Sequence, residues 1–173
     1  RSLKFYIPSL EKTANIDLVV KAYFSTFSSS DTVALGVLSQ NPQEDIKRFN
    51  SIKKECSNAP DNEYPEIILF TDVKEMHEQC HCCIDVDSTY KINLGPLIGL
   101  RFGNPIICLE TSSIQEWLPN DVCYTVKSYE DFVIDSGQSF TYRGEVWQMF
   151  SMFEISLTMR SIYDERSNFR KKQ

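Results

Sequence analysis

Short apolar runs alternate along most of the chain with segments whose apolar residues recur at spacings of three and four. The short runs predict β-strands at 3–7, 32–38, 66–70, 82–86, 105–109 and 121–126. The segments between them predict helices at 15–27, 42–55, 72–79 and 95–102, and a helical turn at 112–117. Asn15 can cap the first of these helices. Because these strands are apolar throughout rather than at alternate positions, both faces of their sheet should be covered. The pattern predicts an α/β, Rossmann-like fold with a parallel sheet of about six strands and helices on both faces.

The apolar spacing changes in the last part of the chain. It predicts one long amphipathic C-terminal helix at 144–166. A chain of 173 residues fits one domain, so we interpret 1–173 as a single domain that ends in this helix. The chain begins without an initiator methionine and enters a strand pattern at once, and we expect it to be part of a longer polypeptide. The apolar positions of the long helix include Trp147, Phe150, Phe153, Leu157 and Tyr163.

Composition and charge exclude some classes of function. Hydrophobic residues make up 42% of the chain and charged residues 24%, which is typical of a folded globular domain. The net charge of −6 argues against a surface that neutralises many phosphates, so we expect no nucleic-acid partner. No apolar run approaches the ~20 residues of a membrane-spanning helix, and the N-terminus does not resemble a signal peptide. We therefore expect a cytoplasmic domain.

The six cysteines raise the question of disulfides and metals. A domain of this size does not need disulfides, and several of the cysteines lie in or beside apolar, strand-like runs, so we expect reduced thiols. The densest group of soft ligands is His77, Cys80, His81, Cys82 and Cys83. A zinc site normally takes four ligands in two pairs, and no second pair lies nearby in the sequence. We predict no metal site.

Four segments, in order, are similar to one family of proteins. Residues 5–18 read FYIPSLEKTANIDL, residues 93–107 read NLGPLIGLRFGNPII, residues 111–116 contain TSS followed by Glu, and residues 159–163 read MRSIY. They resemble the C-terminal domain of retaining GT-B glycosyltransferases of the group 1 or family 4 type, the group that contains sucrose synthase and glycogen synthase. The likeness spans nearly the whole chain.

This resemblance implies a function and a partner domain. It implies a hexosyltransferase that binds a nucleotide-diphosphate sugar as co-substrate, with no other cofactor. The acceptor would be bound by an N-terminal GT-B domain of the same longer chain. Because half of such a cleft cannot exclude water or hold an acceptor, we expect the isolated domain to be inactive.

The resemblance also implies which residues bind the donor. They would lie in three loops at the carboxyl ends of strands, where helix N-termini supply unpaired backbone N–H groups. Alternatives remain open: Lys12 as a solvated lysine, Asp72 as a helix N-cap, and Gly95 as part of a plain strand-to-helix turn. The expected donor-binding residues are Ser9, Lys12, Thr71, Asp72, Asn93, Leu94, Gly95 and Pro96.

The chain departs from the family at the positions that carry charge. The phosphate-binding Arg and Lys of the family fall on Ser9 and Ala14, and its two glutamates fall on Tyr90 and Ile98. The catalytic residues are therefore unknown. A degenerate, inactive GT-B-like binding or regulatory module is the alternative function, and an unrelated dinucleotide-binding domain is disfavoured because no Gly-x-Gly-x-x-Gly follows a strand.

Two acidic residues follow the strand predicted at 82–86. Asp85 and Asp87 share one face at the carboxyl end of this strand, where open α/β sheets place their ligands. They either line that cleft or terminate the strand and cap the next turn.

Overall fold

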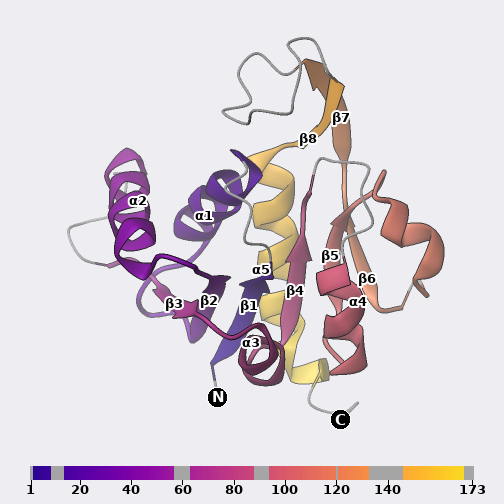
Figure 1. Ribbon diagram of the computed structural model, residues 1–173, viewed down its shortest axis with the longest axis horizontal. Helices are drawn as coiled ribbons and strands as arrows, with labels where there is room; N and C mark the ends of the chain where they lie inside the picture. The colour runs from indigo at the N-terminus through magenta and orange to yellow at the C-terminus, as the bar shows by residue number, and fades with distance from the viewer. Residues whose placement is uncertain are drawn as a thin grey trace.

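The computed structural model describes residues 2–8, 14–56, 63–87, 94–119, 121–132 and 146–169. Its centre is a six-stranded parallel sheet in the order β3-β2-β1-β4-β5-β6, which confirms the predicted fold class (Figure 1). The strands are β1 (Leu3–Ile7), β2 (Val33–Leu38), β3 (Glu66–Phe70), β4 (Cys82–Asp85), β5 (Ile106–Leu109) and β6 (Cys123–Val126). The helices are α1 (Ala14–Thr26), α2 (Pro42–Glu55), α3 (Val73–Gln79), α4 (Leu94–Arg101), the 3-10 turn η1 (Ser113–Trp117) and α5 (Met152–Phe169).

Alternate residues of each strand point to opposite faces of the sheet, and both faces are covered. Phe5 and Ile7 join one apolar core, whereas Tyr6 between them joins the other. Cys82 and Cys83 separate in the same way, as the strand assignment predicted. Because neither face of the inner strands is left to solvent, these strands are apolar at nearly every position.

The larger core lies between the sheet and the helices α1, α2 and α5. Helix α1 contributes an apolar stripe that includes Val19 and Tyr23 and continues at Phe27, just beyond the end of the helix; all three are buried. Helix α5 packs along α1 and adds Ile155 and Met159, both 0% exposed. Figure 1 shows α5 beside α1, so the last helix of the chain covers the first.

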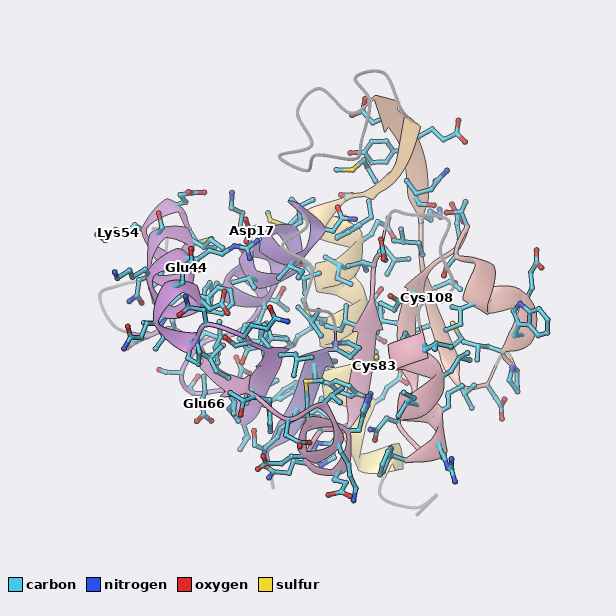
Figure 2. The ribbon with its side chains drawn as sticks, viewed as in Figure 1. Asp17, Glu44, Lys54, Glu66, Cys83 and Cys108 are labelled. Atoms are coloured by element: carbon cyan, nitrogen blue, oxygen red, sulfur yellow. The ribbon has the colours of Figure 1, made fainter. Side chains whose placement is uncertain are left out.

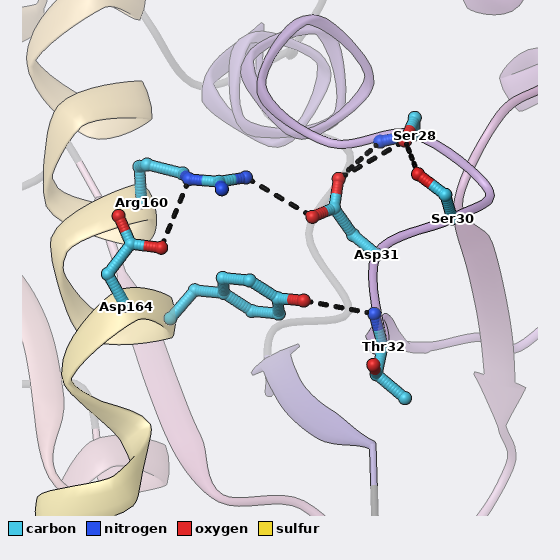
Figure 3. A network of polar contacts seen from close by, with 7 residues as sticks. Ser28, Ser30, Asp31, Thr32, Arg160 and Asp164 are labelled. Carbon is cyan, nitrogen blue, oxygen red and sulfur yellow. Dashed lines mark hydrogen bonds and ion pairs between the residues drawn. The ribbon is translucent and has the colours of Figure 1, made fainter.

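A polar contact fixes α5 to the connection between α1 and β2 (Figure 3). The Tyr163 hydroxyl accepts a hydrogen bond of 3.1 Å from the backbone N–H of Thr32. Arg160 forms two ion pairs: its Nη1 lies 3.2 Å from Asp31 Oδ1, and its Nε lies 3.3 Å from Asp164 Oδ1. The Arg160 guanidinium also lies 5.1 Å from the centre of the Tyr163 ring, so one arginine joins two carboxylates and an aromatic face.

The second core lies under α3, α4 and η1. Its buried residues include Phe70, Met76, Ile106, Ile114 and Leu118. Gly103 ends this region with a φ of +79°, a conformation that favours glycine and allows the chain to turn from α4 into β5.

The long C-terminal helix predicted at 144–166 is present as α5 (Met152–Phe169), but its predicted start at residue 144 is wrong. Residues of this segment form β8 (Val146–Phe150), which pairs in antiparallel fashion with β7 (Ser128–Phe132), and α5 begins only at Met152. The strand at 121–126 is therefore not the last one. Phe150, which we placed on the helical stripe, is a buried strand residue. Leu157 is 51% exposed on α5 rather than part of its buried face, and Phe153 is 64% exposed.

Across the described residues, no helix has both the length and the apolar character needed to cross a membrane.

Candidate functional site

The carboxyl ends of the parallel strands form one edge of the sheet, and the segments that leave them carry the residues predicted from sequence. Strand β1 leads to Pro8, β3 leads to Thr71, and β4 leads to Val86. Helices α3 and α4 follow β3 and β4 along the chain, so both begin on the carboxyl side of these strands. A helix that begins there directs its first N–H groups and the positive end of its dipole towards it.

Thr71 and Asp72 both lie exposed between β3 and α3. Asp72 is the N-cap of α3, since its Oδ1 accepts a hydrogen bond of 2.8 Å from the Glu75 N–H. The structure thus shows Asp72 in the role of a helix N-cap, which the sequence had left open as an alternative to donor binding. Its carboxylate is engaged in this way, which leaves mainly the backbone groups of Asp72 for any ligand.

Helix α4 begins with an apolar outer face. Leu94 is 64% exposed and Ile98, one turn later, is 44% exposed, whereas Pro96 is buried. The first turn of α4 carries no acidic residue of its own. Pro96 lies close to the helix start, where its missing N–H costs no intrahelical bond.

The start of α1 is tied to the end of β4. Asn15 is 2% exposed, and its Nδ2 donates a hydrogen bond of 2.7 Å to the Val86 carbonyl. We expected Asn15 to cap α1, but it lies inside the first turn of the helix. Its side chain instead bonds to a residue 71 positions later in the sequence. This bond fixes the start of α1 to the end of β4, two elements that are far apart in the sequence.

Asp85 and Asp87 lie at the middle of the same edge. Asp85 is the last residue of β4 and is 7% exposed, and Asp87 is half-buried. Asp85 lies opposite Cys108 in the register of β4 and β5, the strands that carry Cys83 and Cys108 in Figure 2. Asp85 therefore terminates the strand, as one of the two predicted roles requires.

Several predicted site residues lie outside the described part of the chain: Ser9, Lys12, Tyr90 and Asn93. Ala14 is described only as the first residue of α1.

A buried polar network was missed by the sequence reasoning. The Tyr6 hydroxyl lies 2.8 Å from His77 Nδ1, and Asn104 Nδ2 donates to the Tyr6 oxygen at 3.2 Å and to the His77 carbonyl at 2.8 Å. Because Asn104 uses the Tyr6 oxygen as acceptor, the Tyr6 O–H is available to donate to His77 Nδ1. The proton of a neutral His77 is then on Nε2.

This network is shielded from solvent. Burial lowers the pKa of His77 and raises the pKa of Tyr6, so both side chains are neutral near pH 7. His77 Nε2 has no hydrogen-bond partner within the part of the chain that the structure describes. The imidazole stacks on Phe102 with 5.8 Å between ring centres and 2° between ring planes.

The network joins the three elements that border the candidate site. Tyr6 is in β1, His77 is in α3, and Asn104 follows α4. A Cβ on Gly99 of α4 would meet the Tyr6 hydroxyl oxygen, so α4 approaches β1 closely at this point. The sequence did mark a close approach at this point, because Gly99 interrupts a predicted helix. The sequence pattern did not indicate that Tyr6 is the residue that approaches Gly99.

No protein-family model matches the sequence. No curated protein matches it either.

Solved structures share its fold. HepE (Alr3699) from Anabaena, solved in complex with UDP, matches with a TM-score of 0.61 and 10% identity over 95% of this chain. A structure of the GtfA/B complex matches with a TM-score of 0.58 and 13% identity over 92%. The catalytic domain of starch synthase IV from Arabidopsis thaliana, bound to ADP and acarbose, matches with a TM-score of 0.55 and 14% identity over the whole chain.

These matches concern only part of each relative. This chain spans 40% of the HepE chain, 28% of the GtfA/B chain and 32% of the starch synthase chain. At such low identity the similarity shows the fold alone. The described domain has the α/β, Rossmann-like fold found within GT-B glycosyltransferases.

Proposed function

We propose that this chain is the domain of a glycosyltransferase that binds the nucleotide-diphosphate sugar. The observation that carries the proposal is the similarity over 95% and 100% of the chain to two proteins solved with different nucleoside diphosphates, UDP and ADP. The group common to these ligands is a diphosphate on a ribonucleoside. A site for that group is what we expect this fold to retain.

The carboxyl edge of the sheet supplies the physical means. Helices α3 and α4 start there, and backbone N–H groups at helix starts bind phosphate oxygens without charged side chains. The first turn of α4 has no carboxylate to repel an anion. In this proposal the residues around Leu94, Gly95 and Pro96 hold the diphosphate, Lys12 and Ser9 approach it from the loop after β1, and Asn93 precedes the helix start.

Thr71 and Asp72 complete the proposed site. They follow β3 at the same edge, and the Asp72 carboxylate is engaged by α3, so their backbone groups are what a nucleoside base would contact. Reading a base through backbone groups requires shape and hydrogen bonding but no charge.

Transfer of the hexosyl group would require the rest of a longer protein. The chain spans only 28–40% of the three matched chains, and a second domain would hold the acceptor and close the cleft. We propose that this full protein acts in the cytoplasm and that the isolated domain binds nucleotide without turnover.

One observation favours a second candidate function, an inactive binding or regulatory module. Ile98 occupies the position of a family glutamate, and it is 44% exposed beside Leu94, which is 64% exposed. An exposed apolar pair is poorly suited to the hydroxyl groups of a sugar, but it is suited to a protein surface.

Calorimetry with UDP, ADP and UMP separates the two candidates. A diphosphate site predicts that UDP or ADP binds more tightly than UMP, and that Lys12→Ala weakens binding by about tenfold through loss of one charge-assisted contact. Lys54→Ala is the matched control, because Lys54 is an exposed lysine of α2 (Figure 2). If neither this chain nor the longer protein binds any nucleoside diphosphate, the donor-binding function is wrong and the module is favoured.

A further inference from the structure

Two cysteine side chains meet between neighbouring strands of the sheet. Cys108 Sγ in β5 lies 2.9 Å from Cys123 Sγ in β6. Cys108 is fully buried, whereas Cys123 is half-buried. The pair thus joins a fully buried residue to one that is partly exposed.

The two thiols differ in acidity because they share a hydrogen bond. The pKa of Cys123 is lowered, chiefly by the hydrogen bond that it shares with Cys108, although burial and the nearby Asp85 oppose this. The pKa of Cys108 is raised, first by the same hydrogen bond and then by burial. Of the two, Cys123 therefore gives up its proton first, and the thiolate is the reactive form of cysteine.

The other four cysteines lack this combination. Cys80, Cys82 and Cys83 are buried, and burial raises the pKa of each. Cys56 is half-buried like Cys123, but burial raises its pKa as well. Cys123 is the one described cysteine that joins partial exposure to a lowered pKa.

We propose that Cys108 and Cys123 form a redox-active dithiol that a hydroperoxide oxidises to a disulfide. The Cys123 thiolate attacks the terminal peroxide oxygen, the O–O bond breaks, and protonation of the leaving oxygen gives water or an alcohol. The resulting Cys123 sulfenic acid is attacked by the Cys108 sulfur, which loses its proton as the S–S bond forms and water leaves. Two thiols lose two electrons in total, and the peroxide gains them.

The strand register allows this reaction with a small movement. Cys123 lies opposite Ile106 and Cys108 lies opposite Thr125, so the two sulfurs meet diagonally across the strands. A disulfide requires a closer approach than 2.9 Å. Among the described residues β6 is the edge strand of the six-stranded sheet, so a small slide of β6 along β5, or rotation of the two side chains, can bring the sulfurs together without disturbing a further strand.

The sequence offers a direct assay. Residues 102–127 contain Cys108 and Cys123, no other cysteine and no internal Lys or Arg, so trypsin releases both thiols in one peptide. The folded protein is treated with hydrogen peroxide, blocked with N-ethylmaleimide, digested and analysed by mass spectrometry. We expect this peptide to appear unblocked and lighter by two hydrogen atoms, while the peptide at 55–74, which holds Cys56, takes up the blocking group.

Variants test the role of the shared hydrogen bond. In Cys108→Ala the alkylation rate of Cys123 at neutral pH should fall by about threefold or more, because its thiolate loses a donor, whereas Cys56→Ala should leave that rate unchanged. The unmodified protein also tests the proposal without any variant, since Cys123 should alkylate faster than Cys56. The proposal is overturned if Cys56 reacts first, or if peroxide leaves residues 102–127 with two free thiols or with Cys123 oxidised to a sulfinic acid.

Discussion

The Tyr6 hydroxyl lies 2.8 Å from His77 Nδ1, across 71 positions of sequence and inside the core under α3 and α4. The two rings meet edge to face with 5.2 Å between their centres. The bond joins the strand at the centre of the sheet to the helix that follows the Thr71 loop. Its strength therefore bears on the stability of the domain and on the placement of the candidate site.

Tyr6→Phe should lower the free energy of unfolding by about 1–3 kcal/mol. The change leaves His77 Nδ1 without its donor and removes one acceptor of Asn104, and buried polar groups without partners cost this much. Urea unfolding measures the loss. Tyr129→Phe is the control, because Tyr129 is 53% exposed and should change stability little. Equal stability of the Tyr6 variant and the parent would show that the bond contributes nothing net.

Stability should fall in mild acid because of His77. Burial lowers its pKa from the ordinary value of 6.5, so the folded state favours the neutral imidazole while the unfolded chain takes up a proton. The stabilisation is fully present above pH 6.5 and is lost as the pH falls from that value towards the folded pKa. Urea midpoints measured from about pH 8 to about pH 5 should show a decline that is smaller in His77→Gln. Parallel curves for the two proteins would assign the decline to other groups.

Gly99→Ala should destabilise the domain through the same hydroxyl. The added Cβ would lie 2.4 Å from the Tyr6 oxygen, and overpacking of this kind costs about 1–3 kcal/mol, although alanine otherwise favours a helix over glycine by about 1 kcal/mol. In the Tyr6→Phe background the hydroxyl is absent, so Gly99→Ala should cost less there or even stabilise. A double-mutant cycle by urea unfolding measures this coupling, and strictly additive effects would contradict it.

Asn15→Asp should be more harmful than Asn15→Ala. The aspartate would place a buried carboxylate against the Val86 carbonyl, where the amide now donates at 2.7 Å. We expect a loss of at least about 2 kcal/mol for the aspartate and about 1 kcal/mol for the alanine at neutral pH. Thermal or urea unfolding checks the order. The aspartate variant should recover part of its stability below about pH 5, where its carboxyl group becomes protonated and can donate.

The parallel sheet was predictable because each of its strands is a short run of apolar residues bounded by polar ones. The hairpin of β7 and β8 was not. Strand β7 reads Ser-Tyr-Glu-Asp-Phe and lacks such a run. In β8 the residues Val146, Met149 and Phe150 have spacings of three and four, which fit a helix as well as a strand. Pairing with β7, which local spacing does not encode, decided between them.

The candidate site was predictable only in outline. The rule that ligands bind at the carboxyl ends of parallel strands pointed to the segments that begin at Thr71 and Leu94, which follow β3 and β4 along the chain, and a ligand there stays a prediction. The contacts of Asn15 and Tyr6 each span 71 positions, and no local pattern marks which distant group a buried polar side chain will meet. Asn15 was therefore read as a helix cap, and Tyr6 only as part of a strand.

The packing of α5 on α1 has a consequence for synthesis of the protein on the ribosome. The apolar stripe of α1, with Phe27 among its residues, is covered by residues such as Met159 and Tyr163, which are translated more than 130 positions later. Until α5 emerges, the nascent chain presents that stripe to solvent and to chaperones. Contacts of such long sequence separation also slow folding, so the core of this domain should be completed only after α5 has left the ribosome.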